Sequence, residues 1–253
     1  MLTLKELERA FYNDQFIPFY QPIIDTKNGH TAAFEILLRL KKDGQLIMPS
    51  EFIGTLEDSW LIEPVTYFLL EKAFALMTQY NGQFKLSLNV PPQLLTNEEI
   101  INQIQACKRL YQSFDHGLIL EITERLPIQQ LDNTISIIQR LQQEGVCIYI
   151  DDYIPNHIHS SLIALSALEG IKIDRSVTNT ARINQQVSML NTPTSKDVQW
   201  IAEGIDSEEK KLHWLKAGVI FQQGFLFSPP HDESEISSML ATNWHTVAIE
   251  AHS

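Results

Sequence analysis

The chain has 253 residues, of which 44% are hydrophobic, and its formal net charge is −12. This length suits one α/β barrel domain, and this hydrophobic content can bury a substantial core. The strong negative charge argues against broad binding to DNA or RNA, because their phosphate backbones require a basic surface.

The ends and the cysteines bear on where the protein works. The N-terminal segment 1–16 is amphipathic and of mixed charge, which is not the pattern of a signal peptide. No apolar run reaches the roughly 18 residues of a membrane span, so we expect a cytoplasmic protein that does not associate with membranes. Cys107 and Cys147 form no disulfide pattern, and the run around Cys147 (VCIYI) predicts a buried thiol.

Short apolar runs of β-type composition alternate with amphipathic segments along the chain. The predicted strands are 16–23, 30–40, 84–90, 117–123, 146–151, 170–174, 198–203 and 219–225. The predicted helices are 64–80, 97–113, 128–144, 160–168 and 207–217. Thr96 and Glu99 resemble a capping box, and Ser207 is a predicted N-cap. Gly145 and Gly218 stand where helix C-caps are expected.

This alternation predicts a parallel sheet covered by helices. A closed barrel and an open doubly wound sheet both fit the alternation. The number of strands and the places of the polar residues favour a TIM-type (β/α)8 barrel, formed by one domain over residues 1–253. The first connection differs, because Asn28-Gly29 between two apolar runs is typical of a hairpin. We therefore expect the first two strands to be antiparallel.

Polar residues recur in or just after these apolar runs. They are Glu35, Asn89, Glu121, Asp151 with Asp152, Lys172 with Asp174, Glu203, and Gln223. In a barrel, the C-terminal ends of parallel strands meet at one mouth, where several carboxylates would repel each other unless cations lay between them. Oxygen ligands suit Mg²⁺ or Mn²⁺, and adjacent aspartates can serve a pair of ions. Each acidic residue taken alone could instead cap the following helix.

Eight motifs in this order resemble the EAL phosphodiesterase domain over nearly the whole chain. They read FYQPIID (19–25), FEILLRL (34–40), LSLNVPPQLL (86–95), LEITE (120–124), IDDY (150–153), IKIDRS (171–176), IAEGID (201–206) and QQGFLFSPP (222–230). The signature triplet is Glu35-Ile36-Leu37. The resemblance implies a single EAL domain without a separate sensory or GGDEF domain. It also implies hydrolysis of cyclic di-GMP to linear pGpG, which lowers a bacterial second messenger that regulates biofilm formation and motility.

The resemblance assigns roles to individual residues. Two divalent cations, Mg²⁺ or Mn²⁺, are expected in each active site. The implied ligands are Glu35, Asn89, Glu121 and Asp151 for the first, and Asp151 with Asp152 for the second. Lys172 and Glu203 match the residues that position and deprotonate the attacking water. Substrate-binding positions match Gln21, Arg39 and Gln223. Residues that orient their neighbours match Glu124, Asp174 and Asp206, the last one methylene shorter than the family's glutamate.

The loop after the two aspartates departs from the family pattern. The family has a glycine-containing stretch (DDFGTG), whereas this chain has DDYIPNHIHSS over 151–161. Glycine permits a positive φ that Ile154 resists, so we expect the change to affect the second metal site. Three functions stay open: an active phosphodiesterase, a cyclic di-GMP receptor or protein-binding regulator with weak or no catalysis, and a metal-dependent hydrolase of another phosphodiester. A homodimer and a protein partner in signalling are expected from the resemblance.

Overall fold

The computed structural model describes residues 1–96, 98–112, 114–122, 131–154, 168–178 and 198–245. Its strands are β1 (Phe16–Asp25), β2 (His30–Lys42), β3 (Gln45–Ile47), β4 (Lys85–Val90), β5 (Leu118–Ile122), β6 (Cys147–Tyr153), β7 (Gly170–Ile173), β8 (Gln199–Ala202) and β9 (Phe221–Gln222). Its α-helices are α1 (Leu4–Tyr12), α2 (Ile53–Glu57), α3 (Ile62–Gln79), α4 (Glu99–Leu110), α5 (Leu131–Gln143), α7 (Arg175–Thr178), α9 (Glu208–Lys216) and α10 (Ile236–Ala241). Short 3₁₀ turns are η1 (Pro49–Glu51), η2 (Pro92–Thr96) and η5 (Glu233–Glu235).

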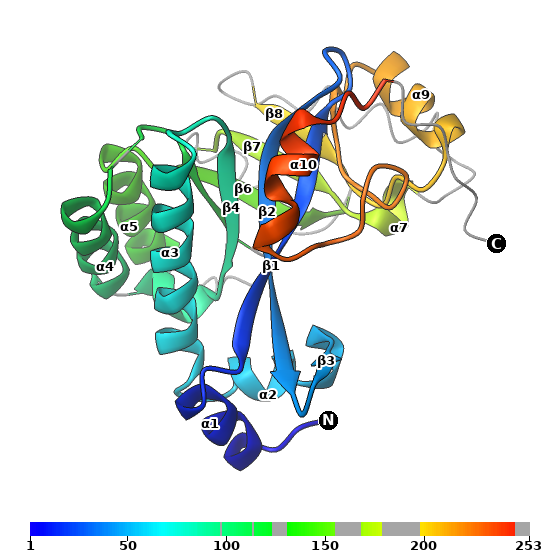
Figure 1. Cartoon of the computed structure of the whole chain (residues 1–253). Coiled ribbons are helices and arrows are strands. Elements are labelled where there is room, and N and C mark those ends of the chain that lie inside the picture. Colours follow the sequence, from blue (N-terminus) through cyan, green and yellow to red (C-terminus); the bar gives the residue numbers. More distant parts are fainter. Residues whose placement is uncertain (97, 113, 123–130, 155–167, 179–197, 246–253) are drawn as a thin grey trace.

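The sheet closes into a barrel of eight strands (Figure 1). Its order is β1-β9-β8-β7-β6-β5-β4-β2, and β1 pairs back with β2. Strand β1 is antiparallel to both β2 and β9, and the remaining barrel pairs are parallel. Closure confirms the predicted barrel and rules out an open doubly wound sheet. The short strand β3, which was not predicted from the sequence, pairs with β2 outside the barrel through the turn Asp43-Gly44.

The predicted hairpin between the first two strands is confirmed. The carboxylate Oδ1 of Asp25 accepts hydrogen bonds from the backbone N–H groups of Lys27 and Asn28, at 2.9 and 3.1 Å. Gly29 completes the turn at φ +72°, a conformation that side chains with a Cβ disfavour. The antiparallel register then runs from Phe16 opposite Leu40 to the turn.

Three of the predicted helix ends are confirmed and one is wrong. Ser207 accepts a hydrogen bond from the backbone of α9 as its N-cap, and Gly145 and Gly218 have positive φ after α5 and α9. The capping box at Thr96 does not form, because the Thr96 hydroxyl ends the turn η2 by donating to Gln93 O at 2.6 Å. Glu98 is the N-cap of α4 instead. The helix predicted at 160–168 falls almost entirely outside the described residues.

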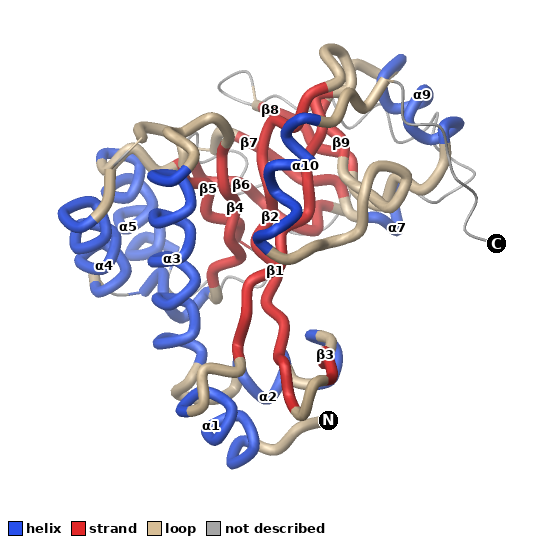
Figure 2. Tube along the Cα trace, in the orientation of Figure 1, coloured by secondary structure: helices blue, strands red, loops and turns tan. Residues whose placement is uncertain are grey.

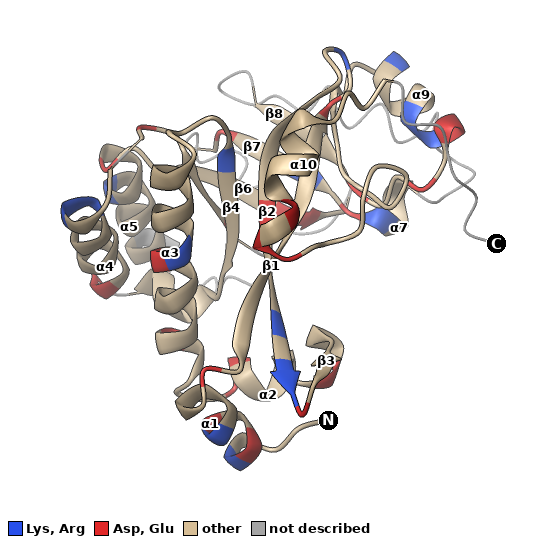
Figure 3. Cartoon of the chain, viewed as in Figure 1, with Lys and Arg blue, Asp and Glu red and all other residues tan. Residues whose placement is uncertain are grey.

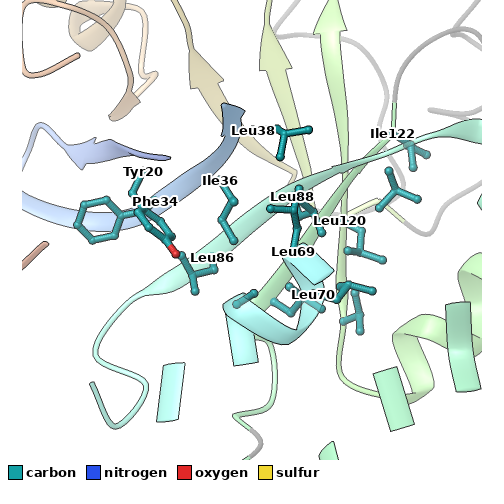
Figure 4. Packing of buried hydrophobic residues seen from close by; sticks show 14 of the residues in the cluster. Tyr20, Phe34, Ile36, Leu38, Leu69, Leu70, Leu86, Leu88, Leu120 and Ile122 are labelled. Atoms are coloured by element: carbon teal, nitrogen blue, oxygen red, sulfur yellow. The ribbon is translucent and has the colours of Figure 1, made fainter. Parts of the chain in front are cut away.

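Strand alternation divides the core into two layers. One face of the strands points into the barrel, where buried side chains form a small cluster: Ile23, Ala33, Ile119, Cys147, Tyr149 and Ile201. The opposite face packs against the helices, and Figure 4 shows Ile36, Leu88 and Leu120 beside Leu69 and Leu70 of α3. Cys147 is 2% exposed, so the predicted burial of its thiol is confirmed. The inner cluster forms the apolar base on which the polar site is built.

The β1–β2 hairpin extends beyond the barrel and carries a small lobe. Helices α1 and α2 and strand β3 lie around the far part of β1 and β2, away from α10 (Figure 2). Trp60, which follows α2, is 52% exposed and its indole N–H donates to Glu8 Oε1 at 3.2 Å. Among the described residues, none of the helices has the length and hydrophobicity to cross a bilayer.

Gly224→Ala is expected to destabilise the fold, because two backbone segments meet at this position. A Cβ on Gly224 would lie 2.1 Å from Ile205 O and 2.3 Å from Ile205 N, closer than any van der Waals contact. Overpacking of this kind costs about 1–3 kcal/mol or more. Urea unfolding measures the effect. The matched control is Gly54→Ala in α2, where a Cβ meets nothing within 4 Å and a small gain is expected. Equal stability of the two variants would contradict the packing argument.

Candidate active site

The strand register brings the polar residues to one end of the barrel interior. Glu35 of β2 lies opposite Ser87, two residues before Asn89 of β4. Asn89 in turn lies opposite Glu121 of β5. Alternate residues of a strand share a face, so the side chains of Glu35, Asn89 and Glu121 point into the barrel together.

The same rule continues around the barrel. Tyr149 of β6 lies opposite Glu121, and Asp151 follows it two residues later on the same face. Lys172 of β7 lies opposite Ile201 of β8, and Glu203 follows Ile201 by two residues. The mouth of the barrel therefore collects carboxylates from β2, β5, β6 and the end of β8, and one lysine from β7.

The ammonium group of Lys172 lies among four carboxylates. Its Nζ is 2.7 Å from Glu203 Oε1, 2.9 Å from Glu121 Oε2, 3.1 Å from Asp151 Oδ1 and 3.2 Å from Glu35 Oε2. The lysine is fully buried, at 0% exposure. A single positive charge leaves this cluster strongly acidic, which is the arrangement that divalent cations neutralise.

Two amide side chains orient Glu35. Asn89 Nδ2 donates to Glu35 Oε1 at 3.1 Å, and Gln223 Nε2 donates to Glu35 Oε2 at 2.7 Å. Gln223 Nε2 also lies 3.1 Å from Gln21 Oε1, and Gln21 donates to Ser228 O at 3.1 Å. The two hydrogen bonds to Glu35 fix the orientation of its carboxylate within the cluster.

Burial and mutual repulsion shift the acid equilibria of the cluster. Burial raises the pKa of Glu203 to about 8 although Lys172 opposes the shift, with Asp151 and Glu35 adding to it. Burial also raises the pKa of Glu121 well above its usual value. Burial alone would lower the pKa of Lys172, but the surrounding carboxylates outweigh it and raise that pKa. Burial thus makes the charged forms of Glu121 and Glu203 costly, and Lys172 only partly offsets that cost.

Asp152 has an unusual backbone. Its φ is +54°, and the pairing of β6 with β7 is irregular between Ile150 and Tyr153. Asp151 is buried whereas Asp152 is exposed. Although Asp152 as a whole residue is exposed, partial desolvation of its carboxyl group, followed by the neighbouring Asp151 and Asp174 carboxylates, raises the pKa of Asp152 to about 6. The bulge turns two successive carboxylates toward the mouth, where strict strand alternation would separate them.

The donor set fits two divalent cations. One oxygen each of Glu35, Glu121 and Asp151 lies within 4.8 Å of the others, and the same holds for Asp151, Asp152 and Glu203. Asp151 belongs to both groups, as a bridging ligand would. Glu121 Oε1 is buried and has no hydrogen-bond partner among the residues that the structure describes, an arrangement that costs energy unless a cation binds there. Sequence reasoning gave Glu203 no part among the ligands, and the geometry adds it as a candidate.

A cavity of about 380 Å³ opens above this cluster. It is lined by Gln21, Glu35, Leu37, Asp151, Asp152, Arg175, Glu203, Gly204, Asp206, Gln223, Gly224 and Phe225. The sequence patterns did not predict Arg175 and Phe225 as site residues, although the two belong to the motifs IKIDRS and QQGFLFSPP. Acidic residues, red in Figure 3, also occur on the loops around α7 and α10, while Lys and Arg are scattered.

Arg39 and Asp174 are not among the described residues that line this cavity. Arg39 is 5% exposed, with Nη1 donating to Leu38 O at 2.9 Å and its guanidinium 5.5 Å from the centre of the Phe19 ring. Asp174 accepts a hydrogen bond from the backbone of Ser176 at the start of α7.

Asp206 is exposed on the cavity wall, and its Oδ2 forms an ion pair with Lys210 Nζ at 2.7 Å, outside the acidic cluster. Glu124 lies outside the described residues.

The chain therefore forms a closed β/α barrel with a cluster of carboxylates at one mouth. A family model described as "EAL domain" matches residues 4–230. Because this match covers most of the chain, the protein belongs to the EAL domain family.

Individual relatives agree with this assignment. The chain is 30% identical to the uncharacterized protein sll1895 of Synechocystis, over 93% of this chain and 35% of that protein. It is 25% identical to the probable cyclic di-GMP phosphodiesterase PdeG of Escherichia coli, over 88% of this chain and 46% of that protein. The solved structure of the EAL enzyme Bd1971 in its cAMP- and cyclic-di-GMP-bound form superposes with a TM-score of 0.85 at 25% identity, over 93% of this chain and 67% of that one. The chain thus spans less than half the length of these curated relatives.

Proposed function

We propose that this chain is a phosphodiesterase that hydrolyses cyclic di-GMP to linear pGpG with the help of two divalent cations. One water molecule adds across one phosphodiester bond and opens the ring. The observation that carries the proposal is the presence of two sets of three carboxylates that have Asp151 in common. Glu121 Oε1, in the first set, is buried and has no hydrogen-bond partner among the described residues. The naming of PdeG as a probable cyclic di-GMP phosphodiesterase supports the choice of substrate.

Different residues of the chain would hold the two cations. Glu35, Asn89, Glu121 and Asp151 would hold the first cation, and Asp151 with Asp152 the second, for which Glu203 is a further candidate ligand. Bound cations acidify a water molecule and offset charge on the phosphate.

Two further residues serve the attacking water, Glu203 directly and Lys172 through its contact with Glu203. Glu203 lies on the cavity wall and is placed to take the proton of the attacking water. Lys172 holds Glu203 at 2.7 Å and fixes its orientation.

Substrate binding falls to the residues that flank the acidic centre. Gln21 and Gln223 line the cavity and can bind polar groups of the dinucleotide. Arg39 is positioned on the same face of β2 as Glu35, four residues further along the strand. A guanidinium there can donate a bidentate pair to a phosphate, at the expense of its present contact with Leu38 O.

A receptor function is the second candidate, and the loop after Asp152 favours it. That loop lacks the family glycines, and Asp152 adopts a positive φ at the position where it would hold the second cation. A protein with a weakened second site would bind cyclic di-GMP and hydrolyse it slowly. It would then act through a partner protein. We also propose, from the family resemblance, that the chain forms a homodimer and functions in the cytoplasm.

A hydrolysis assay tests the proposal. Purified protein is incubated with cyclic di-GMP and Mn²⁺ or Mg²⁺, and nucleotides are separated by chromatography. We expect pGpG to form in the presence of the metal and not to form when excess EDTA is added. Calorimetry under both conditions reports binding. Tight binding without product supports the receptor, and absence of both contradicts the proposed function.

A further inference from the structure

The backbone of Glu203 is hydrogen-bonded on the side that faces β7 and α7. Its N–H donates to the carbonyl of Ile173, the last residue of β7, at 3.2 Å. Its carbonyl oxygen accepts a hydrogen bond from the hydroxyl of Thr178, on α7, at 2.6 Å. The pairing of β7 with β8 ends with Ile173 opposite Ala202. The Thr178 hydroxyl therefore supports the backbone one residue beyond the end of the strand pairing.

Thr178 is itself firmly placed. It is buried, and its N–H donates to Asp174 O at 3.2 Å. The N–H of Asp174 donates to Tyr153 O at 3.2 Å, which links α7 to the end of β6. The Thr178 hydroxyl also lies 3.1 Å from Arg175 O, but a hydroxyl has one hydrogen to donate, and the contact with Glu203 O is the shorter one. Helix α7 thus holds this hydroxyl beside the end of β8.

The carboxylate of Glu203 depends on where its backbone is held. The chain turns directly after it, because Gly204 has φ +64°, outside the strand region. Glu203 Oε1 lies 2.7 Å from Lys172 Nζ, and the residue forms a set of carboxylates with Asp151 and Asp152. Lys172 Nζ contacts three further carboxylates, so it is not reserved for Glu203. The reach of the Glu203 side chain into the cavity therefore also depends on the position of its main chain.

We infer that Thr178 is a positioning residue, whose hydroxyl fixes the main chain of Glu203 and so places the Glu203 carboxylate beside the second cation. This inference rests on the proposed function, which supplies the cation, and it adds a residue on which a candidate ligand depends. Residues that orient a metal ligand affect metal affinity and turnover without touching the substrate. A displacement of about 1 Å in an active site can lower the rate by about 10²-fold.

Removal of the hydroxyl tests this role. Thr178→Val keeps the branched shape of the side chain, Thr178→Ala removes the hydroxyl without adding a methyl group in its place, and Thr178→Ser keeps the hydroxyl. The first two variants should weaken Mn²⁺ binding, measured by calorimetry, by about tenfold. They should lower kcat for cyclic di-GMP by about tenfold and leave KM unchanged, because Thr178 does not touch the substrate. Thr178→Ser should retain both values.

Thr66→Val is the matched control. The Thr66 hydroxyl is buried in α3 and donates to Ile62 O at 2.7 Å, so this variant also loses a buried hydrogen bond to a carbonyl. Thr66 does not line the cavity, and Mn²⁺ affinity and kcat should both remain. Urea unfolding in EDTA compares the stability of the variants, and similar losses in Thr66→Val and Thr178→Val are expected.

The outcomes separate this inference from the proposed function. If the wild-type protein binds Mn²⁺ without hydrolysing cyclic di-GMP, the Mn²⁺ affinities of the variants still decide the role of Thr178. Wild-type hydrolysis with unchanged Mn²⁺ affinity and kcat in Thr178→Val and Thr178→Ala would overturn the positioning role and leave the phosphodiesterase standing. Equal losses in Thr66→Val, or no recovery in Thr178→Ser, would overturn it as well. A wild-type protein that binds neither Mn²⁺ nor cyclic di-GMP overturns both proposals.

Discussion

Glu121→Gln is expected to abolish hydrolysis of cyclic di-GMP while leaving the barrel folded. The substitution keeps the shape of the side chain and removes one negative oxygen from a position that is 0% exposed. An amide cannot supply the charge that Glu121 Oε1 would offer a cation, and loss of such a ligand removes several kcal/mol of charge stabilisation. Turnover should fall by about 10³-fold or more.

Two measurements distinguish this loss from unfolding. Circular dichroism should match the wild type, and calorimetric titration with Mn²⁺ should show weaker binding. Glu51→Gln, at an exposed position in η1, is the matched control and should retain both activity and metal binding. Activity within tenfold of the wild type would remove Glu121 from the ligand set and with it the basis of the proposed site.

Lys172→Met is expected to be the most destabilising change in the site when metal is absent. The ammonium group lies within 3.2 Å of oxygens from Glu35, Glu121, Asp151 and Glu203. Without it these carboxylates face each other in a buried space. Removal of one partner of a buried ion pair costs about 3–5 kcal/mol, because the remaining charges lose their compensation. Urea unfolding in EDTA measures the free energy of unfolding.

The same variant shows whether cations replace the lysine charge. Saturating Mn²⁺ should raise the free energy of unfolding of Lys172→Met by more than it raises that of the wild type, because binding to the folded state adds stability. Adding Glu121→Gln to Lys172→Met should cost less than the sum of the single changes, since one repelling charge is gone. Lys216→Met, exposed at the end of α9, is the control. Stability within 1 kcal/mol of the wild type in EDTA would contradict this account of the cluster.

The amino-acid sequence was sufficient for the barrel and for much of its site. Each buried strand needs apolar residues at successive positions, so Glu35, Asn89 and Lys172 stand out in their runs as residues that burial alone would exclude. The intervals from Asn89 onward, through Glu121, Asp151, Lys172, Glu203 and Gln223, resemble the length of one strand and one helix, which predicted that these residues meet at the same end of the barrel. The structure brings them together there. The chemical roles assigned to them stay predictions that the variants above test.

Other features depended on contacts that the sequence patterns did not resolve, some of them local. The predicted capping box at Thr96 is wrong, because the preceding turn η2 uses the hydroxyl that the motif assigned to α4. Strand β3 pairs with β2 through the two-residue turn Asp43-Gly44, a hairpin signal from which no strand was predicted. Arg175 and Phe225 reach the cavity through the close packing of Gly204 and Gly224, which no pattern in either segment encodes alone.

By itself, the sequence determined which faces are apolar and which positions carry oxygen ligands, since strand and helix periodicities and side-chain chemistry are local properties. Closure of the sheet required β1 to pair with both β2 and β9, and β9 lies about 200 residues after β1 in the chain. The placement of Lys172 among four carboxylates, and the pKa shifts that follow, depend on distances of a few ångströms between side chains from different strands. Only the tertiary structure decides those distances, because electrostatic interaction and burial vary steeply with position in space and not with position in sequence.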